Sequence, residues 1–279
     1  MLVAMSRVAV GIGLRDEYVD ELLRGTDRAT LDVLEILIDG GLEPGRRRTQ
    51  WRRLGAKWPL VAHGTNLGVA DAEGVDLDYV AAVQATVREV RPLWYSEHLA
   101  FVRAGGIELG HFGPVDADPE TLDVLRANAA CVRDGLRCPF VLENAADVLG
   151  FGGADGAARG RAFARALEVS GSGALLDLTN AIYDARNEGF DVADYLDNVP
   201  WWRVVQLHLA GGCAHDGLWI DGHSARIDAE ALTLLPEVAR RAPNLRAVII
   251  ERDEHLPPLV ELLDEVQEVR IRLAEAGRR

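Results

Sequence analysis

Cysteine is scarce in this sequence, and so are the marks of export. Cys131, Cys138 and Cys213 form no Cys-x-x-Cys pair, and an odd number in a chain of 279 residues is not typical of a disulfide framework. No charged start leads into an apolar segment with a cleavage site, and no window approaches the roughly twenty apolar residues that span a bilayer. These absences argue against secretion and membrane insertion, and they predict a protein of the reducing cytoplasm.

Positive charge is also in short supply. Lys and Arg number 30 against 44 Asp and Glu, which gives a formal net charge of −14. Such a chain repels a phosphate backbone, so we expect no nucleic-acid partner. The one basic cluster, Arg46 to Arg48 with Arg52 and Arg53, is expected to lie on a solvated loop.

What the sequence does contain is a regular alternation of short apolar runs and longer helical patterns, which is typical of repeated βα units. Eight runs are predicted to be strands: Val8–Leu14, Val33–Leu37, Pro59–His63, Trp94–Leu99, Pro139–Glu143, Ala174–Leu178, Val204–Leu209 and Ala247–Glu251. Helices are predicted for stretches that include Asp76–Val90, Pro119–Arg133, Arg159–Val169, Asp228–Arg241 and Pro257–Ala276.

The same alternation occurs in doubly wound open sheets, so the pattern by itself leaves two architectures open. Eight βα units in about 250 residues is the usual size of a (β/α)₈ barrel of the TIM type. The sequence shows no low-complexity linker, and the Gly/Ala stretch from Gly150 to Gly160 is only as long as a loop with a helix start. We therefore predict an α/β protein, with residues 1–279 as a single barrel domain.

Metal-binding residue types stand at the ends of the predicted strands. The carboxyl ends of barrel strands meet at one mouth, where barrel enzymes place their reacting groups. The residues at these positions that can bind a metal are His63, His98, Glu143, Asp177, His208 and Glu251.

Each of these residues has an ordinary structural explanation. A lone histidine at the end of a strand is more often hydrogen-bonded in the core, and a lone carboxylate more often caps the following helix. Taken together, however, they would leave several carboxylates buried without partners at one mouth, and a cation supplies those partners.

A further candidate pair, Asp221 and His223, lies in the loop after the seventh strand, although Asp-Gly is also an ordinary turn dipeptide. With this pair the set has four imidazoles and four carboxylates, more than one ion can use. The set therefore indicates two or three metal ions, and nitrogen and oxygen ligands without thiolate suit iron, manganese or zinc.

The order and spacing of these motifs resemble those of the multinuclear non-haem iron-dependent oxidative enzymes, the family that includes the methanobactin biosynthetic oxidase. The resemblance runs from about Val8 to Asp253. It rests on Gly11-Ile12-Gly13-Leu14-Arg15, Ser96-Glu97-His98-Leu99-Ala100, Leu142-Glu143-Asn144, Leu176-Asp177-Leu178-Thr179-Asn180, His208-Leu209-Ala210-Gly211, Asp221-Gly222-His223 and Ile250-Glu251-Arg252-Asp253.

The resemblance implies a TIM-type barrel that holds two or three iron ions and uses dioxygen as co-substrate. The expected substrate is a residue, often cysteine, of a ribosomally made precursor peptide, and a separate protein is expected to help deliver the peptide. Carried over by motif, the iron ligands are His63, His98, Glu143, Asp177, His208, Asp221, His223 and Glu251.

Some positions near these motifs have other expected roles or depart from the family pattern. Asp253 is a candidate base beside the metals or a cap of the last helix, and Asn144 and Asn180 are expected either to orient ligands or substrate or to bond strand ends. The family often has another histidine after the His208 motif, Thr and Asp around the loop histidine, and Trp before the last Asp. This chain has instead Gly212-Cys213, Gly222, Ser224 and Arg252.

Two other functions fit a barrel with these ligands. One is a redox-neutral divalent-metal enzyme, such as a sugar isomerase or a phosphodiesterase, because similar clusters bind metals for Lewis-acid chemistry. The other is a non-catalytic metal-binding or partner-binding scaffold. Oxygen consumption by iron-loaded protein separates the oxidative enzyme from both.

Overall fold

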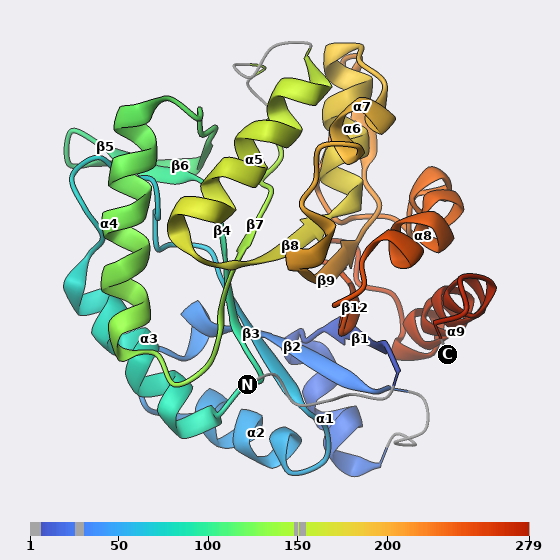
Figure 1. Ribbon diagram of the computed structural model, residues 1–279. Coiled ribbons are helices and arrows are strands. Elements are labelled where there is room, and N and C mark those ends of the chain that lie inside the picture. Colours follow the sequence, from blue (N-terminus) through green and yellow to red (C-terminus); the bar gives the residue numbers. More distant parts are fainter. Residues whose placement is uncertain (1–6, 26–30, 148–149, 151–154, 279) are drawn as a thin grey trace.

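The computed structural model describes residues 7–25, 31–147, 150 and 155–278, and its centre is a closed barrel of eight parallel strands (Figure 1). The strands pair in the order β1-β12-β9-β8-β7-β4-β3-β2. Their bounds are β1 Ala9–Gly13, β2 Val33–Leu37, β3 Leu60–Gly64, β4 Tyr95–His98, β7 Phe140–Glu143, β8 Gly173–Asp177, β9 Val204–Leu209 and β12 Ala247–Ile250. All eight predicted strands are present with ends shifted by at most one residue, so the barrel is confirmed and the open sheet is ruled out.

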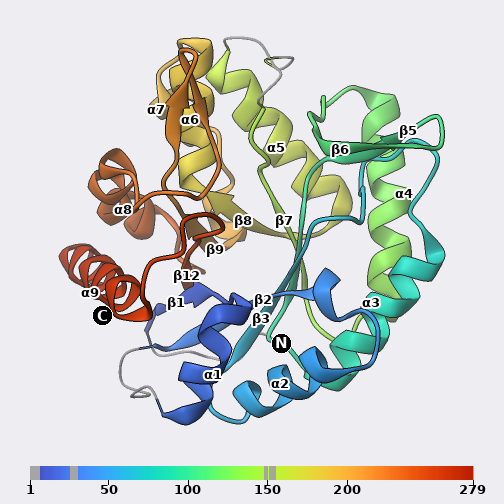
Figure 2. The ribbon, with the colours of Figure 1, turned by 180° about the vertical axis from the view of Figure 1, so that it is seen from behind.

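Helices surround this barrel in both opposite views (Figures 1 and 2). Asp76, Asp118 and Asp228 cap three of them by accepting backbone N–H bonds, as expected at helix starts. The helices are α1 Asp16–Arg24, α2 Arg46–Gly55, α3 Leu77–Val90, α4 Pro119–Gly135, α5 Gly156–Ser170, α6 Leu178–Glu188, α7 Val192–Leu196, α8 Ala229–Arg241 and α9 Leu259–Glu275, with short 3₁₀ turns at Ile38–Gly41 and Trp201–Arg203. Among the described residues, no helix is long and apolar enough to cross a membrane.

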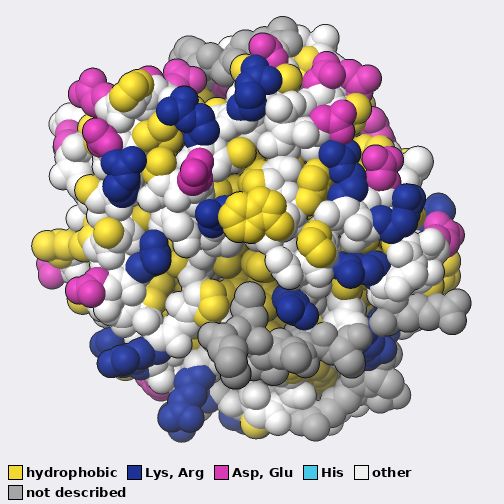
Figure 3. Space-filling view, in the orientation of Figure 1, with side chains coloured by type: hydrophobic (Ala, Val, Ile, Leu, Met, Phe, Trp, Pro, Cys, Tyr) yellow, Lys and Arg dark blue, Asp and Glu magenta, His cyan; other side chains and the backbone are white. Residues whose placement is uncertain are grey.

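The basic cluster lies on a helix, so the prediction of a solvated loop is wrong. Arg46 to Arg48 open α2, and the helix buries Trp51 and Leu54. Arg48 is itself buried, and its Nε donates to the Gly41 carbonyl at 2.6 Å. The spacing of Arg48, Trp51 and Leu54 puts one helix face against the barrel, which the run of arginines concealed. On the face drawn in Figure 3, Lys and Arg side chains are spread out, and Asp and Glu gather along its upper part.

Two antiparallel hairpins were not predicted. β5 (Phe101–Ala104) pairs with β6 (Ile107–Gly113) after β4, and β10 (Cys213–His215) pairs with β11 (Leu218–Ile220) after β9. Both leave the C-terminal ends of barrel strands, so they frame the barrel mouth.

The interior of the barrel is layered, and this layering places the site. An apolar cluster separate from the main core contains Val61, Val141, Leu175 and Ile249, one from each of four strands. Side chains on a strand alternate between its two faces, so the residue two positions further on points the same way. Those residues are His63, Glu143, Asp177 and Glu251, which therefore lie directly above the apolar layer.

Candidate metal centre

The first group of possible metal ligands comes from three neighbouring strands, β3, β4 and β7. The Nε2 atoms of His63 and His98 lie 3.3 and 3.5 Å from Oε2 of Glu143. One ligand atom from each residue lies within 4.8 Å of the others. Two imidazole nitrogens and a carboxylate oxygen thus face one point at the barrel mouth.

The other nitrogen of each imidazole is already occupied. Nδ1 of His63 lies 2.9 Å from the Ser96 hydroxyl, and Nδ1 of His98 lies 3.3 Å from the Gly64 carbonyl. A hydrogen bond at one ring nitrogen fixes the tautomer and leaves the other nitrogen for a metal. Phe112 of β6 stacks on the His98 ring at 3.8 Å, which further limits its rotation.

The second group shares Glu143 with the first and also contains Asp177, His208 and Glu251. Nδ1 of His208 lies 3.0 Å from Oε1 of Glu143 and 2.9 Å from Oε2 of Glu251. Glu143 therefore directs one oxygen toward each group. All four residues are buried. The arrangement offers two adjoining candidate metal positions that share Glu143.

Glu35 of β2 is a buried residue that was not predicted from the sequence. It contacts Nε2 of His208, the ring nitrogen that does not face Glu143 and Glu251. Its carboxylate lies 3.1 Å from Nε2 of His208 and accepts a 2.6 Å hydrogen bond from Nε2 of Gln206. Gln206 in turn accepts from the Trp94 indole at 2.5 Å, which sets the orientation of its amide. The only signal for this chain of contacts was a single charged residue within the apolar run of β2.

Asn144 and Asn180 both bind Asp177. Asn144 donates to the Asp177 carbonyl at 2.9 Å and accepts from its backbone N–H at 2.8 Å. The backbone N–H of Asn180 donates to Oδ1 of Asp177 at 2.8 Å. Asn144 thus bonds the Asp177 backbone and not its carboxylate, and the Asn180 bond makes Asp177 the N-cap of α6. A role of either asparagine in orienting ligands or substrate stays a prediction.

The loop pair lies beside the second group but outside both compact sets of ligand atoms. Nε2 of His223 lies 2.8 Å from Asp221, and its Nδ1 lies 3.8 Å from Oε2 of Glu251. Nδ1 also lies 3.0 Å from Asp253, which forms an ion pair with Arg15. His223 has a left-handed backbone with φ of 46°, which is uncommon for a residue other than glycine.

Asp253 therefore belongs to a network at the edge of the site. The last helix, α9, begins with Pro258 as its N-cap, so Asp253 does not cap it. Its side chain is 44% exposed and is held between Arg15 and His223. Asp253 therefore lies beside the loop pair, and its role as a base there stays a prediction.

The histidines of the site differ in their electrostatics. For His208 of β9, burial disfavours charge, but Glu251, Glu35 and Glu143 outweigh it and raise the pKa well above its usual value. Burial, helped by His63 and His208, lowers the pKa of His98 to about 4. Burial also disfavours charge on His223, but Glu251 and Asp221 outweigh it and raise the pKa of His223 to about 10. His98 is therefore neutral and ready to bind a metal at pH 7, whereas His223 carries a proton.

The buried carboxylates differ in how their charge is compensated. Burial raises the pKa values of Glu143 and Glu251, but His208 and the neighbouring histidines outweigh it and lower the pKa of Glu143 to about 2 and that of Glu251 well below its usual range. Burial, Asp221 and Glu143 raise the pKa of Asp177 well above its usual range. Oε2 of Glu143 and Oδ2 of Asp177 are buried without hydrogen-bond partners. Within the described part of the chain, no Lys or Arg forms an ion pair with Glu143, Asp177 or Glu251. A divalent cation satisfies these oxygens, so the residues present fit a metal site.

Together the fold and the site define a class of protein, a TIM barrel with a candidate multinuclear metal centre at its mouth. Residues 9–274 match the family model of the RiPP precursor modification enzymes MbnB/TglH/ChrH. RiPPs are ribosomally synthesised and post-translationally modified peptides. The chain belongs to this family, which modifies precursor peptides.

Relatives are similar over nearly the whole chain. A UPF0276 protein of Rhizorhabdus wittichii is 35% identical over 269 residues, which cover 95% of each chain. One of Caulobacter vibrioides is 33% identical over 270 residues, with 96% of this chain and 95% of the relative covered.

Solved structures resemble the chain at the level of the fold. Endonuclease IV of Thermus thermophilus superposes with a TM-score of 0.59 at 17% identity, covering 97% of this chain and all of the other. A D-psicose 3-epimerase superposes with a TM-score of 0.56 at 13% identity, with 96% and 97% covered. At these identities the likeness shows only that the barrel is shared.

The departures from the family pattern lie beside the ligands. Arg252 is buried, and it donates to Glu265 of α9 at 2.9 Å. Glu265 also accepts the backbone N–H of Ile227 at 2.9 Å. The arginine at this position thus ties the end of β12 to α9 and to the segment that precedes α8.

Proposed function

We propose that this protein is a multinuclear non-haem iron enzyme that uses dioxygen to modify a residue, expected to be cysteine, in a ribosomally made precursor peptide. Family membership supports peptide modification. The observation that carries the metal proposal is Glu143, whose two oxygens face two adjoining groups of ligands. A shared carboxylate between two buried groups suits a cluster better than a single ion.

The strand-borne ligands would hold two ions. His63, His98 and Glu143 would hold one, and Glu143, Asp177, His208 and Glu251 the other. Asp221 and His223 would hold a third ion beside Glu251. Bound iron would supply the redox chemistry with dioxygen, which the side chains alone cannot perform.

The protein's own groups have separate tasks in this proposal. Glu35, Ser96 and the Gly64 carbonyl orient the three strand-borne imidazoles. Asp253 accepts a proton at the exposed edge of the site, where Arg15 keeps its carboxylate in place. The apolar layer below the ligands keeps water from reaching the centre through the bottom of the barrel.

The test is metal analysis of protein purified anaerobically from iron-rich medium. We expect more than one iron per chain, spectroscopic coupling between irons, and oxygen consumption with a cysteine-containing precursor peptide. If fully active protein contains only a single zinc ion per chain, even after anaerobic reconstitution with iron, the proposal is contradicted. Turnover of a sugar or phosphodiester without oxygen consumption would instead favour the redox-neutral alternative. A separate peptide-delivering protein is part of the proposal, and neighbouring genes identify candidates for it.

A further inference from the structure

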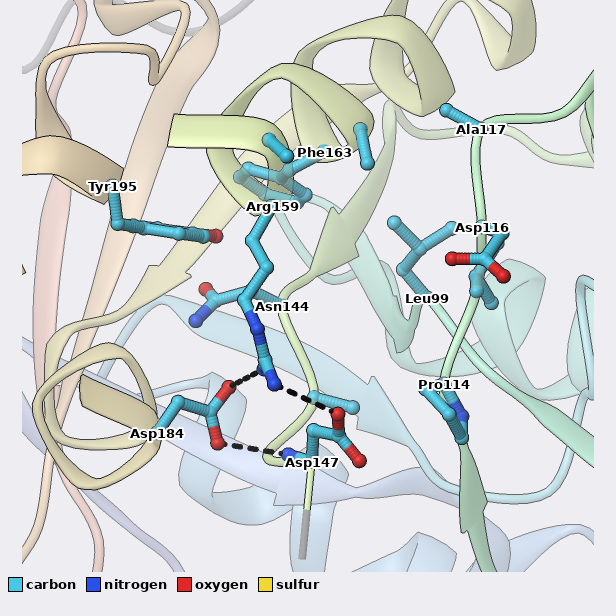
Figure 4. Close-up of a pocket in the computed structure, with 14 residues that line it drawn as sticks. Leu99, Pro114, Asp116, Ala117, Asn144, Asp147, Arg159, Phe163, Asp184 and Tyr195 are labelled. Carbon is cyan, nitrogen blue, oxygen red and sulfur yellow. Dashed lines mark hydrogen bonds and ion pairs between the residues drawn. The ribbon is translucent and has the colours of Figure 1, made fainter. Parts of the chain in front are cut away.

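A cavity of about 300 Å³ that contains none of the candidate metal ligands opens at the ends of two ligand-bearing strands (Figure 4). It lies between the loops that follow β6 and β7 and the helices α5, α6 and α7. Leu99 and Asn144 line it, and each directly follows a candidate metal ligand, His98 or Glu143. The cavity therefore reaches the ends of β4 and β7, where these two candidate ligands stand.

The charged side chains of this cavity are mostly acidic. Asp116, Asp147 and Asp184 line it together with one cation, Arg159. Arg159 lies between two of the carboxylates, 3.0 Å from Asp147 and 3.0 Å from Asp184, as the dashed lines in Figure 4 show. Burial raises the pKa of Asp184 to about 7, so its charge is partial at neutral pH. Asp116 and Asp147 together still outweigh the one guanidinium, which is already engaged, and the cavity is net acidic.

A buried hydroxyl also points into the cavity. Tyr195 of α7 is only 6% exposed, and its hydroxyl has no hydrogen-bond partner. Figure 4 shows the hydroxyl end of the ring directed toward Arg159 and Asn144. A buried polar group without a partner is rare, and a ligand that donates a hydrogen bond supplies one here.

The remaining walls are apolar. Leu99, Val115 and Phe163 line the space together with several alanines. Lys and Arg side chains combine an apolar stem with a charged end, so they match a cavity with apolar walls and acidic groups. An acidic side chain would meet these carboxylates, and a purely apolar one would leave the buried Tyr195 hydroxyl without a partner.

We propose that this acidic cavity is a specificity subsite that binds a Lys or Arg side chain of the precursor peptide, close in sequence to the modified residue. The proposal rests on the proposed function for the existence of a peptide substrate. It adds a positively charged residue at a fixed place in that substrate. The volume, at the lower end of the range for ligand pockets, suits one long side chain.

The test uses metal-free protein and short peptides of the form acetyl-Gly-Gly-X-Gly-Gly-amide, where X is Lys, Arg, norleucine or Glu. Binding is measured by ligand-observed NMR and calorimetry. We expect the Lys and Arg peptides to bind at least about fivefold more tightly than the norleucine peptide, and the Glu peptide to bind most weakly.

Two variants and one control assign the binding to this cavity. Asp116→Asn and Tyr195→Phe should each weaken binding of the Lys peptide by about threefold or more and leave the norleucine peptide unchanged. Asp20→Asn makes the same change of charge on the exposed face of α1 and should alter neither.

Equal affinity for the Lys and norleucine peptides, tighter binding of the Glu peptide, or no binding of any peptide at about 10 mM would overturn the proposal. Unaltered binding in both cavity variants would do the same. Because these peptides lack cysteine and the assay needs neither metal nor dioxygen, its outcome is independent of the iron chemistry. Failure of the oxidation proposal would appear only in the metal and oxygen assays.

Discussion

The candidate metal centre has two parts that are built differently. His63, Glu143 and their partners are strand-borne, and hydrogen bonds from neighbouring strands fix their side chains. Asp221 and His223 are carried by the loop between β11 and α8, and His223 adopts a left-handed backbone. Strand positions hold a ligand more precisely than loop positions do, so we expect the first part to be preformed and the second to depend more on the metal for its order.

Protonation separates His98 of the first strand-borne group from His223 of the loop, whereas His208 of the second strand-borne group resembles His223 in having a raised pKa. His98 has a pKa of about 4, because burial disfavours the imidazolium. His223 has a pKa of about 10, because Glu251 and Asp221 stabilise its imidazolium. A metal binds His98 directly but must displace a proton from His223, and from His208 as well.

The largest effect is expected from Glu143→Gln, because this residue serves both strand-borne groups. We expect the variant to lose more than about 100-fold in metal affinity, beyond the 10–100-fold typical when a partner of a ligand is removed. Activity should be lost with the metal. His208→Ala should behave similarly. Circular dichroism should show the fold retained, because the apolar layers build the barrel. Iron counts equal to wild type in both variants would remove these residues from the ligand set.

A smaller effect is expected from Glu35→Gln, which tests how far the preformed part depends on residues that do not bind metal. The change keeps the shape but weakens the contact with Nε2 of His208, so metal affinity should fall about 10–100-fold. Glu35→Asp should recover part of the loss. Glu17→Gln, on the exposed face of α1, is the matched control. If Glu35→Gln binds metal as tightly as the control does, Glu35 has no positioning role.

Glu35 also shows where sequence reasoning stopped. The strand-borne set could be predicted because each ligand closes an apolar run, and closed parallel strands bring their ends together. Glu35 lies in the middle of β2, and its partner Gln206 lies in the middle of β9. Neither residue is at a strand end. The energetic cost of burying a lone carboxylate indicates that Glu35 needs a hydrogen-bonding or charged partner, but the sequence alone did not identify His208 as that partner.

The hairpins and the basic helix were missed for different reasons. Gly105-Gly106 and Asp216-Gly217 are strong hairpin turn signals, but the short flanking strands lie outside the barrel and lack a long apolar run. In α2, the run of arginines obscured the spacing of Arg48, Trp51 and Leu54, which is typical of a helix with one buried face. The acidic cavity could not be predicted, because Asp116, Asp184 and Tyr195 come from three separate segments that only the folded barrel brings together.

Metal retention at different pH values sharpens the contrast in protonation. Below about pH 10, His223 is protonated in the metal-free protein, so binding there releases a proton and weakens as the pH falls. Affinity at the loop position should drop up to about tenfold per pH unit between pH 8.5 and 6.5. The metal affinity of the group that contains His98 should not fall through protonation of His98 over this pH range, because His98 is already neutral. Metal counting after mild chelation at each pH checks this. Equal pH dependence at the group with His98 and at the loop position would contradict the contrast.

The smallest effect on total metal is expected from His223→Ala, which removes a ligand of the loop position alone. Loop ligands must be ordered on binding, and that entropy cost makes their ion the most labile. In an anaerobic chelator titration of wild type, one ion should leave first, and the variant should lack that first step while it keeps the tightly held ions. Spectroscopy at each step identifies the ion that leaves. Asp20→Asn, far from the site, should titrate like wild type. If His223→Ala instead loses the most tightly held ion, the loop residue belongs to the preformed part, and the division between strand and loop ligands is wrong.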